Sequence, residues 1–477
     1  MHLKRKSPAT GHPALTAIVL ALALSGCAVG PNYQRPATPD VSAFKEAEGW
    51  VAAAPADALE RGPWWTLFGD PVLDQLAARV EVSNQNVAVA VAGYAQARAL
   101  VRSQRAGLFP TVTLNGGATR SGSGAGSSST GTGARVGNNY QIGIGGSWEP
   151  DVWGRLGRAV EGATAGAQAS AADLAAARLS AQGELATNYL SLRQTDAQKV
   201  LLESTIAGYQ RSLEITQNRY SAGIAAKTDV LQAQTQLANA QADNAGLVRQ
   251  RAQLEHAIAV LVGEAPGNFS LAVADWTPLV PDVPVGVPST LLQRRPDIAA
   301  AERRVAAANE QIGIAKSAYF PNLSLSASYG FGASRVADLF QASSSVWGLG
   351  LSAAQVLFNA GATAANVEGS EAAYAQTVAR YRQTVLAAFQ DVEDQLAATR
   401  VLQTQEELRR QASVAADQVE QQVLNRYRSA QLSYTEVITA QATALSARRA
   451  LVQAMADRQT TAVALIQSLG GGWQVGP

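Results

Sequence analysis

The sequence predicts a membrane-associated α+β fold in which two copies of one unit stand in tandem. Three observations predict it: an N-terminal export signal that ends in a cysteine, two motifs that recur at almost equal spacing, and short alternating strands beside very long helices. Together they favour a trimer in which each chain supplies four strands to a shared 12-stranded transmembrane β-barrel, accompanied by long α-helical coiled coils.

Residues 1–26 have the layout of a secretory signal peptide. Three basic residues at 4–6 precede an apolar run from Ala14 to Leu24, about half the ~20 residues that a transmembrane helix needs. A short buried N-terminal helix is the alternative, but such a helix seldom starts behind three basic residues.

The run closes on Leu24-Ser25-Gly26-Cys27, which resembles the lipobox of bacterial lipoproteins. In that family the cysteine becomes the first mature residue and carries a diacylglycerol and an N-acyl chain. Cys27 is therefore the expected lipidation site, and Ala28 after it implies sorting to the outer membrane. Several acyl chains together anchor a protein firmly, because each buried CH₂ contributes ~0.8 kcal/mol.

Composition argues against nucleic-acid binding and against most enzymes. Three of the 38 basic residues lie in the signal peptide, which leaves 35 against 37 acidic residues and a formal charge of −2. Nucleic acid needs a concentrated basic face instead. His256 is the only mature histidine and Cys27 the only cysteine, so no His/Cys metal cluster or Cys–His nucleophile can form. We expect no enzyme activity, metal or cofactor besides the covalent lipid, although catalysis by carboxylates alone stays formally open.

The chain contains an internal duplication of about 210 residues, which is the kind of period that defines an architecture. Phe109-Pro110 recurs as Phe320-Pro321, 211 residues later, within similar surroundings. The triplet Asn218-Arg219-Tyr220 recurs as Asn425-Arg426-Tyr427, 207 residues later. Two anchors at nearly equal offsets indicate one unit repeated twice, over 72–263 and 290–469.

Each unit is expected to run helix, two strands, long helix, long helix. The first helix spans Val72 to about Leu108 and ends before Pro110. A proline-free stretch of good helix formers, from about Arg155 to Tyr220, predicts a helix of ~100 Å at 1.5 Å per residue. Breaks at 221–223 separate it from a second helix that continues to about Val262.

Apolar and alanine residues recur every seven positions along the last helix of each unit, which keeps a seam facing a partner. The seams are Leu231, Ala238, Ala245, Ala252, Ala259 and Ile438, Leu445, Val452, Gln459, Ile466. The glutamine- and asparagine-rich opposite faces fit a water-filled interior as well as an outer surface. A stalk or solid coiled-coil bundle therefore stays open on the helices alone.

Four segments alternate apolar with small polar residues, as transmembrane β-strands do. They are expected at about 110–120, 138–149, 321–333 and 346–358. A soluble half-buried sheet is the alternative, but serine and glycine leave a bare second face where a packed core would need bulk. Four strands cannot close in lipid, where open sheet edges are not tolerated. Two chains would give eight strands and a filled interior, whereas three give twelve and room for a pore.

Several separate runs carry a resemblance that covers essentially the whole mature chain. They are Cys27-Ala28-Val29-Gly30-Pro31-Asn32-Tyr33, Trp64-Trp65, Phe68-Gly69-Asp70, Trp148-Glu149-Pro150-Asp151-Val152-Trp153-Gly154, Arg295-Pro296-Asp297-Ile298 and Leu469-Gly470-Gly471-Gly472-Trp473. With these runs the chain resembles the TolC-like outer-membrane efflux factors, in particular the NodT-type lipoprotein branch that serves resistance–nodulation–division (RND) pumps.

The resemblance implies a homotrimer with a shared barrel above a periplasmic helical tunnel. It implies an equatorial collar from about 27–71, 264–289 and 470–477, and a Gram-negative outer-membrane location. The implied activity is passive: a duct through which an RND pump and its periplasmic adaptor expel small molecules. A type I protein-secretion channel and a structural coiled-coil lipoprotein without a pore are the competing interpretations.

In the family, the turns between the paired long helices meet the adaptor. They map here onto Arg219, Tyr220, Gly223, Thr228, Asp229, Arg426, Tyr427, Thr435 and Glu436. Tyr220 and Tyr427 are expected to pack across each hairpin, and Thr228 and Asp229 to serve equally well as ordinary helix-capping residues. Ala430 is the residue of the second turn that corresponds to Gly223 in the first. Because glycine alone adopts positive φ at little cost, we expect the two turns to differ in shape.

The closed periplasmic aperture of the family is lined by side chains near the second turn. The candidates are Asp417, Glu420, Gln421 and Leu424. Relatives often place an acidic ring there, whereas glutamine, leucine and asparagine dominate this last turn. An aspartate gate with strong cation selectivity is therefore not expected.

Overall fold

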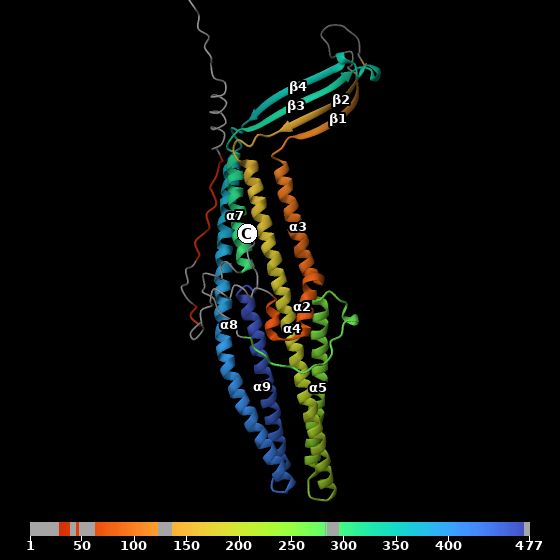
Figure 1. Ribbon diagram of the computed structural model, residues 1–477, viewed down its shortest axis with the longest axis vertical. Helices are drawn as coiled ribbons and strands as arrows, with labels where there is room; N and C mark the ends of the chain where they lie inside the picture. Colours follow the sequence, from red (N-terminus) through yellow and green to blue (C-terminus); the bar gives the residue numbers. More distant parts are fainter. Residues whose placement is uncertain are drawn as a thin grey trace, which may run out of the picture. The chain divides into compact units, whose positions relative to one another are not determined.

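The computed structural model describes residues 28–38, 44–46, 63–122, 136–281, 283 and 295–471. The described residues fall into two compact units. The first unit is drawn from 1–36, 95–169 and 302–380, and the second unit from 37–94, 170–301 and 381–477. Each unit takes segments from both sequence repeats, so neither repeat is compact by itself. Figure 1 shows the elements in chain order.

The first unit contains one antiparallel sheet in the order β1-β2-β3-β4 (Figure 1). Its strands are β1 (Thr111–Gly122), β2 (Val136–Trp148), β3 (Asn322–Ala333) and β4 (Ser345–Ala354). Four strands per chain were predicted, but β4 ends at Ala354 and not at 358. Beyond it, the side-chain amide of Gln355 donates to the carbonyl of Tyr319 over 3.1 Å, and the pairing with β3 stops at Ala354.

The register of the sheet gathers apolar side chains on one face. Leu114 lies opposite Ile144, Ile144 opposite Tyr329, and Tyr329 opposite Trp347. These four side chains are between 54% and 72% exposed. On the other face, Gly143 lies opposite Gly330. A Cβ on Gly330 would stand 2.5 Å from the carbonyl oxygen of Ile142, so this close approach requires glycine.

Long helices connect to the strands in both repeats. They are α3 (Gln85–Ala106), α4 (Arg155–Ser221), α7 (Pro296–Ser317) and α8 (Ala362–Arg428). The second unit also holds η2 (Trp64–Phe68), α2 (Pro71–Ser83), α5 (Lys227–Leu261) and α9 (Tyr434–Ser468). Short 3₁₀ turns lie at Pro266–Asn268, Val336–Asp338 and Ala342–Ser344. Within the described ranges, no helix is both long and apolar enough to cross a membrane.

The expected single helix from Val72 to Leu108 is wrong, because Asn84 divides it into α2 and α3. Asn84 has an extended backbone (ψ 125°), and its side-chain oxygen accepts the N–H groups of Asn86 and Val87. Its amide donates to the carbonyl of Leu261 over 2.8 Å. Asn84 therefore acts as the N-cap of α3, the position that asparagine favours.

The expected seams differ between the two paired helices. Along α9, the seam residues from Ile438 to Ile466 are half-buried or buried. In α5, by contrast, Leu231, Ala238 and Ala245 are exposed, and only Ala259 is fully buried. The beginning of the α5 seam therefore has no cover within the described part of this chain.

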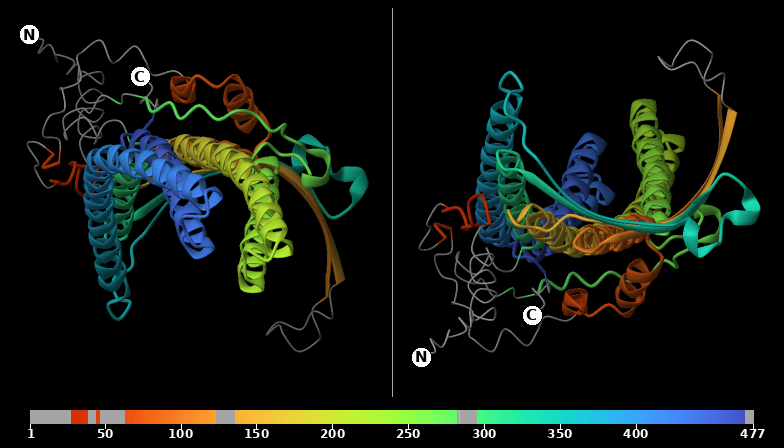
Figure 2. Two further views of the ribbon diagram at one scale, coloured as in Figure 1. Left: turned by 90° about the horizontal axis from the view of Figure 1, so that it is seen from below. Right: turned by 90° about the horizontal axis from the view of Figure 1, so that it is seen from above.

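Figure 2 shows the curvature of the sheet, whose strands appear in its right view as one curved band. The strands twist together, as sheets of L-residues do. At their ends in the first unit, the rings of Trp153 and Phe320 are stacked 4.8 Å apart. The Trp153 indole N–H donates to the carbonyl of Pro321 over 2.7 Å. The Trp148 indole N–H donates to the carbonyl of Leu108 over 2.9 Å. Tryptophan thus fixes the passage between strands and helices.

Candidate functional site

The two turns that join the long helices have the same backbone shape, so the expected difference between them is wrong. Gly223 has φ +76° and Ala430 φ +60°. In the first turn, the N–H groups of Gly223 and Ile224 donate to the carbonyls of Tyr220 and Arg219. In the second, Ala430 and Gln431 donate in the same way to Tyr427 and Arg426. Closing the helix end requires positive φ, and Ala430 adopts it although a side chain there costs roughly 1–2 kcal/mol.

A small apolar core, which we call the tip cluster, lies behind the turns in the second unit. It consists of Ala233, Tyr427, Tyr434 and Val437, with half-buried residues such as Leu424 packed against it. The rings of Tyr427 and Tyr434 are 5.4 Å apart and about 4% and 3% exposed. Burial, and secondarily the neighbouring Tyr427, raises the pKa of Tyr434 to about 12. Tyr434 is therefore a neutral phenol at physiological pH.

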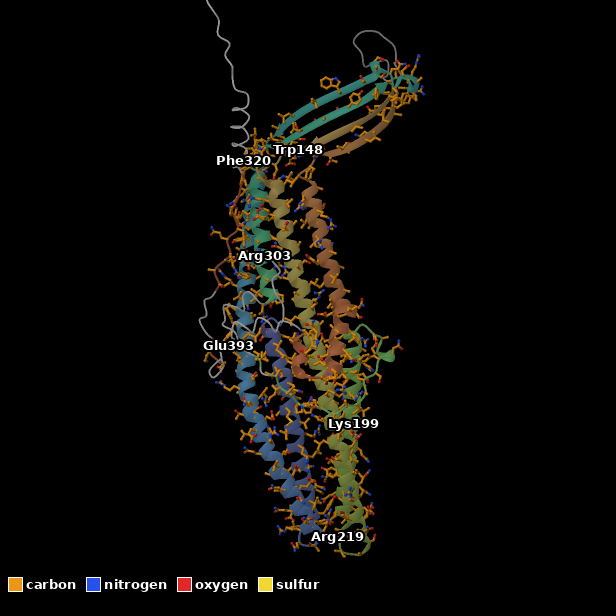
Figure 3. All side chains as sticks on the ribbon, in the orientation of Figure 1. Trp148, Lys199, Arg219, Arg303, Phe320 and Glu393 are labelled. Atoms are coloured by element: carbon orange, nitrogen blue, oxygen red, sulfur yellow. The ribbon has the colours of Figure 1, made fainter. Side chains whose placement is uncertain are left out.

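Arg219 joins the two hairpins at the tip cluster. Its guanidinium lies 4.5 Å from the centroid of the Tyr427 ring. Its Nη1 donates to the Tyr427 carbonyl over 2.7 Å, and the Thr216 and Tyr427 hydroxyls are 3.4 Å apart. Figure 3 labels Arg219 at the ends of these helices. Of the two tyrosines expected to pack, Tyr427 does so, whereas Tyr220 is 45% exposed.

The other predicted turn residues face solvent in this chain. Gly223, Thr228, Arg426, Thr435 and Glu436 are exposed, and Asp229 is half-buried. The capping alternative for Thr228 and Asp229 is not what the chain does, because the N-cap of α5 is Ala226 and it has no side-chain cap. These side chains therefore do not complete their own helix end.

The acidic aperture candidates are held by one arginine of α9. Arg448 Nε donates to Asp417 over 2.7 Å, and its Nη2 donates to Glu420 over 2.6 Å. Burial alone would lower the pKa of Arg448, but the two carboxylates raise it above the ordinary value. Gln421 is exposed, and Leu424 packs on the tip cluster. The four candidates thus differ in role, and the two acids share one arginine, which leaves this group with a net charge of −1.

A groove of about 800 Å³ runs between α5 and α9. Amide, hydroxyl and small side chains line it, with Leu231 and Ile438 as larger apolar members. Arg449 pairs with Asp243 across it over 3.0 Å. Such a lining suits water and mixed solutes. Among the described residues, no three histidine, cysteine, aspartate or glutamate side chains gather closely enough to hold a metal ion.

Sequence reasoning missed a buried ion pair between Arg158 and Glu310 in the first unit. This pair, together with the neighbouring Asn309 and Gly313, is called the N-terminal clamp. Arg158 Nη1 donates to Glu310 over 2.6 Å and to the carbonyl of Pro31, and Nη2 donates to that of Gly30. Asn309 also donates to Pro31. The one available signal was the glycine of the Gly30-Pro31 run, since Gly30 has φ +110°.

Glycines make the clamp possible. A Cβ on Gly30 would stand 2.5 Å from the Cα of Gly313, and one on Gly313 would stand 2.2 Å from the Arg158 side chain. Nearby, burial and the charge of Glu310 raise the pKa of Glu161. The predicted lipidation site, Cys27, lies outside the described residues. The next residues are fixed: the Val29 N–H donates to the carbonyl of Trp153 over 3.0 Å.

The quoted sequence runs also have structural roles here. Asp151 accepts the N–H groups of Leu156 and Gly157 and so caps α4. Asp70 caps α2 and accepts the Tyr189 hydroxyl over 2.6 Å. Arg295 pairs with Asp297 and Asp391 and donates to the carbonyl of Ser468. These runs hold the ends of helices together.

Comparison with known proteins finds one family across most of the chain. The family model "Outer membrane efflux protein" matches residues 76–264 and 287–471. The probable efflux pump outer membrane protein TtgC of Pseudomonas putida is 32% identical over 463 residues, covering 96% of this chain and 95% of TtgC. The cation efflux system protein CusC of Escherichia coli is 29% identical, covering 95% and 98%. The solved outer-membrane channel OprN superposes with a TM-score of 0.86 at 31% identity, covering 94% and 100%.

Proposed function

As a member of the outer membrane efflux protein family, this chain is the outer-membrane channel component of an efflux pump, and we propose that it works as a homotrimeric passive exit duct for small toxic molecules. Its relatives are efflux channel proteins and not enzymes. Its place is the outer membrane of a Gram-negative cell. The pump supplies the transport energy, so the chain itself needs only a path.

The sheet carries this proposal. Its apolar face, with Leu114 and Trp347 each 72% exposed, suits lipid and would be a liability in water. Its other face is mostly small and polar, with glycine and serine opposite one another and Asn115 and Gln141 as the longer polar members, which leaves space for a lumen. The edge strands β1 and β4 have no neighbour within the described chain, and lipid does not tolerate open edges. Three chains close twelve strands around a pore.

The turns support docking of a periplasmic adaptor that links the channel to an RND pump. Gly223 is exposed, and an added Cβ would meet nothing within 4 Å in this chain. Gly223→Leu should therefore leave the trimer in the outer membrane but abolish adaptor-dependent drug tolerance. Gly361→Leu, at an exposed glycine with φ +89° and equal room outside the turns, is the matched control, because it carries the same backbone strain, and it should keep both. Normal drug tolerance with Gly223→Leu would argue that this turn does not dock.

A lipid on Cys27 would anchor the N-terminal segment beside the clamp. Cys27→Ser should abolish labelling by radioactive palmitate, while twelve shared strands still hold the trimer in the membrane. Unchanged labelling would rule out the lipobox assignment.

Planar-bilayer recording tests the duct itself. Purified trimers should give discrete conductance steps with little preference between cations and anions. Stable trimers without conductance would sink the proposal and favour a structural lipoprotein.

A further inference from the structure

The contact between Arg219 and Tyr427 takes one residue from each repeat. The equivalent residues of the opposite repeats, Arg426 and Tyr220, make no such contact in the described chain. At the 207-residue offset, Arg219 corresponds to Arg426 and Tyr220 to Tyr427. The side chains of Arg426 and Tyr220 are both exposed. Within the described part of the chain, neither the Arg426 guanidinium nor the Tyr220 ring has a partner.

We propose that in the assembled trimer Arg426 of each chain covers the ring of Tyr220 of the next chain and donates to its carbonyl. In a closed ring of three chains, first and second repeats alternate, so the second repeat of one chain lies beside the first repeat of the next chain. The contact between these two chains then has the same geometry as the contact between the first and second repeats within one chain. The occupant of the exposed surface at Tyr220 is therefore a second copy of this chain. This inference rests on the proposed trimeric channel.

The backbone at Tyr220 is prepared for this contact. The Tyr427 carbonyl accepts two donors, the N–H of Ala430 at 2.9 Å and Nη1 of Arg219 at 2.7 Å. The Tyr220 carbonyl accepts the equivalent N–H of Gly223, also at 2.9 Å. A carbonyl oxygen has two lone pairs, so one remains for Arg426. The identical turn shapes place this oxygen and the ring in the same relation in both repeats.

Two substitutions between the repeats make the contact between chains the weaker copy. Thr216, whose hydroxyl faces that of Tyr427, corresponds to Val423, which cannot form a hydrogen bond. Tyr434, whose ring packs on Tyr427, corresponds to Lys227. A lysine beside Tyr220 adds no ring and repels the incoming guanidinium. The pair between chains therefore keeps the stacking and one hydrogen bond but loses the two supporting groups.

Cysteine cross-linking distinguishes the two kinds of contact. In Tyr220→Cys/Arg426→Cys trimers, a short bis-maleimide should shift the denatured chain from monomer to covalent trimer. Tyr427→Cys/Arg219→Cys is the matched control, because its two thiols lie in one chain and should give a monomer that carries the mass of one linker. Each single-cysteine variant should give no covalent trimer, which excludes reaction through Cys27.

Native mass spectrometry of the same samples before cross-linking separates failure of this inference from failure of the proposed function. Intact trimers in which the control pair reacts but Tyr220→Cys/Arg426→Cys gives no covalent trimer would overturn the inference and leave the channel standing. Monomers that neither cross-link nor conduct would overturn both.

A double-mutant cycle gives a second readout. In trimers challenged with detergent, Arg426→Ala and Tyr220→Ala should each lower the temperature of dissociation, and the double variant should lower it no further. Fully additive losses would overturn the pairing, because residues that act through one contact are not additive.

Discussion

Arg158 and Glu310 form an ion pair that joins the two sequence repeats, 152 positions apart, and both side chains are less than a tenth exposed. Arg158 makes further hydrogen bonds besides the one to Glu310. Arg158 also donates to the carbonyls of Gly30 and Pro31, so the segment that follows Cys27 is fixed to both repeats. A lipid on Cys27 would then have only Ala28 between it and the first fixed residue, Val29. Attachment to the membrane through such a lipid would therefore be coupled to the folding of the first unit.

Removing one partner of this pair should be far more damaging than removing an exposed one. Arg158→Ala leaves Glu310 buried and unpaired, which typically costs about 3–5 kcal/mol. Arg155→Ala breaks the pair with Glu149, whose side chains are 41% and 30% exposed, and should cost at most about 1 kcal/mol. Thermal unfolding and proteolysis within residues 28–36 measure the difference. Equal losses in the two variants would contradict a structural role for the clamp.

Local sequence was sufficient where one periodicity decides the structure. The alternation around Leu325 and Ile144 predicted the strands, because a period of two assigns every side chain to a face. The proline-free stretch from Arg155 predicted α4 closely, and the family resemblance was correct. Local sequence failed at Asn84, where good helix formers stand on both sides and only the contact with Leu261 distinguishes a cap from a helical asparagine.

The remaining misses depend on partners that are distant in sequence. Alanine at position 430 predicted that the second turn would differ in shape from the first. The hydrogen bonds that close the end of α8 nevertheless hold the backbone of Ala430 in the left-handed region. The lining of an aperture by Asp417 and Glu420 stays a prediction, but their pairing with Arg448, which approaches from another helix, could not be read from the local sequence. The clamp could not be inferred because nothing local relates Arg158 to Glu310. Intrinsic propensity and spacing carry no information about such pairs.

The strain at Ala430 can be relieved by substitution. Ala430→Gly should stabilise the second hairpin by about 0.5–1 kcal/mol, since the gain in the left-handed region exceeds the entropy that glycine adds to the unfolded chain. Gly223→Ala should destabilise the first hairpin by a similar amount. Amide hydrogen exchange at the two turns reports each change locally. Faster exchange in Ala430→Gly would contradict the strain argument.

The duplication also predicts how the sheets of neighbouring chains pair. Ile144 lies opposite Tyr329, and these residues correspond to Leu351 of β4 and Ala118 of β1 by the offsets of 207 and 211. Leu351 of one chain should therefore lie opposite Ala118 of the next. Directly opposite residues in an antiparallel pair have Cα atoms about 4.5–5.5 Å apart, within the range of about 4.4–6.8 Å that a disulfide spans.

This register has a sharp control. Oxidised Leu351→Cys/Ala118→Cys trimers should become covalent, whereas Leu351→Cys/Thr119→Cys should not, because adjacent residues in a strand point to opposite faces. Denaturing gels without reductant measure both. Linkage through Thr119 alone would mean that the register between chains is shifted by one residue, which would turn the apolar face of one sheet inward.

The ion selectivity of the duct should depend on Arg448. Arg448→Gln removes one positive charge per chain and releases the carboxylates of Asp417 and Glu420, which it holds at 2.7 and 2.6 Å. If these acids face the permeation path, cations should become favoured, and the reversal potential in a salt gradient should move accordingly. The shift should shrink as salt rises, because the screening length falls from about 10 Å at 0.1 M to about 3 Å at 1 M. Arg448→Lys keeps a cation beside both acids and should leave the selectivity unchanged. A Gln variant with unaltered selectivity would place Asp417 and Glu420 away from the path and assign the constriction to other side chains.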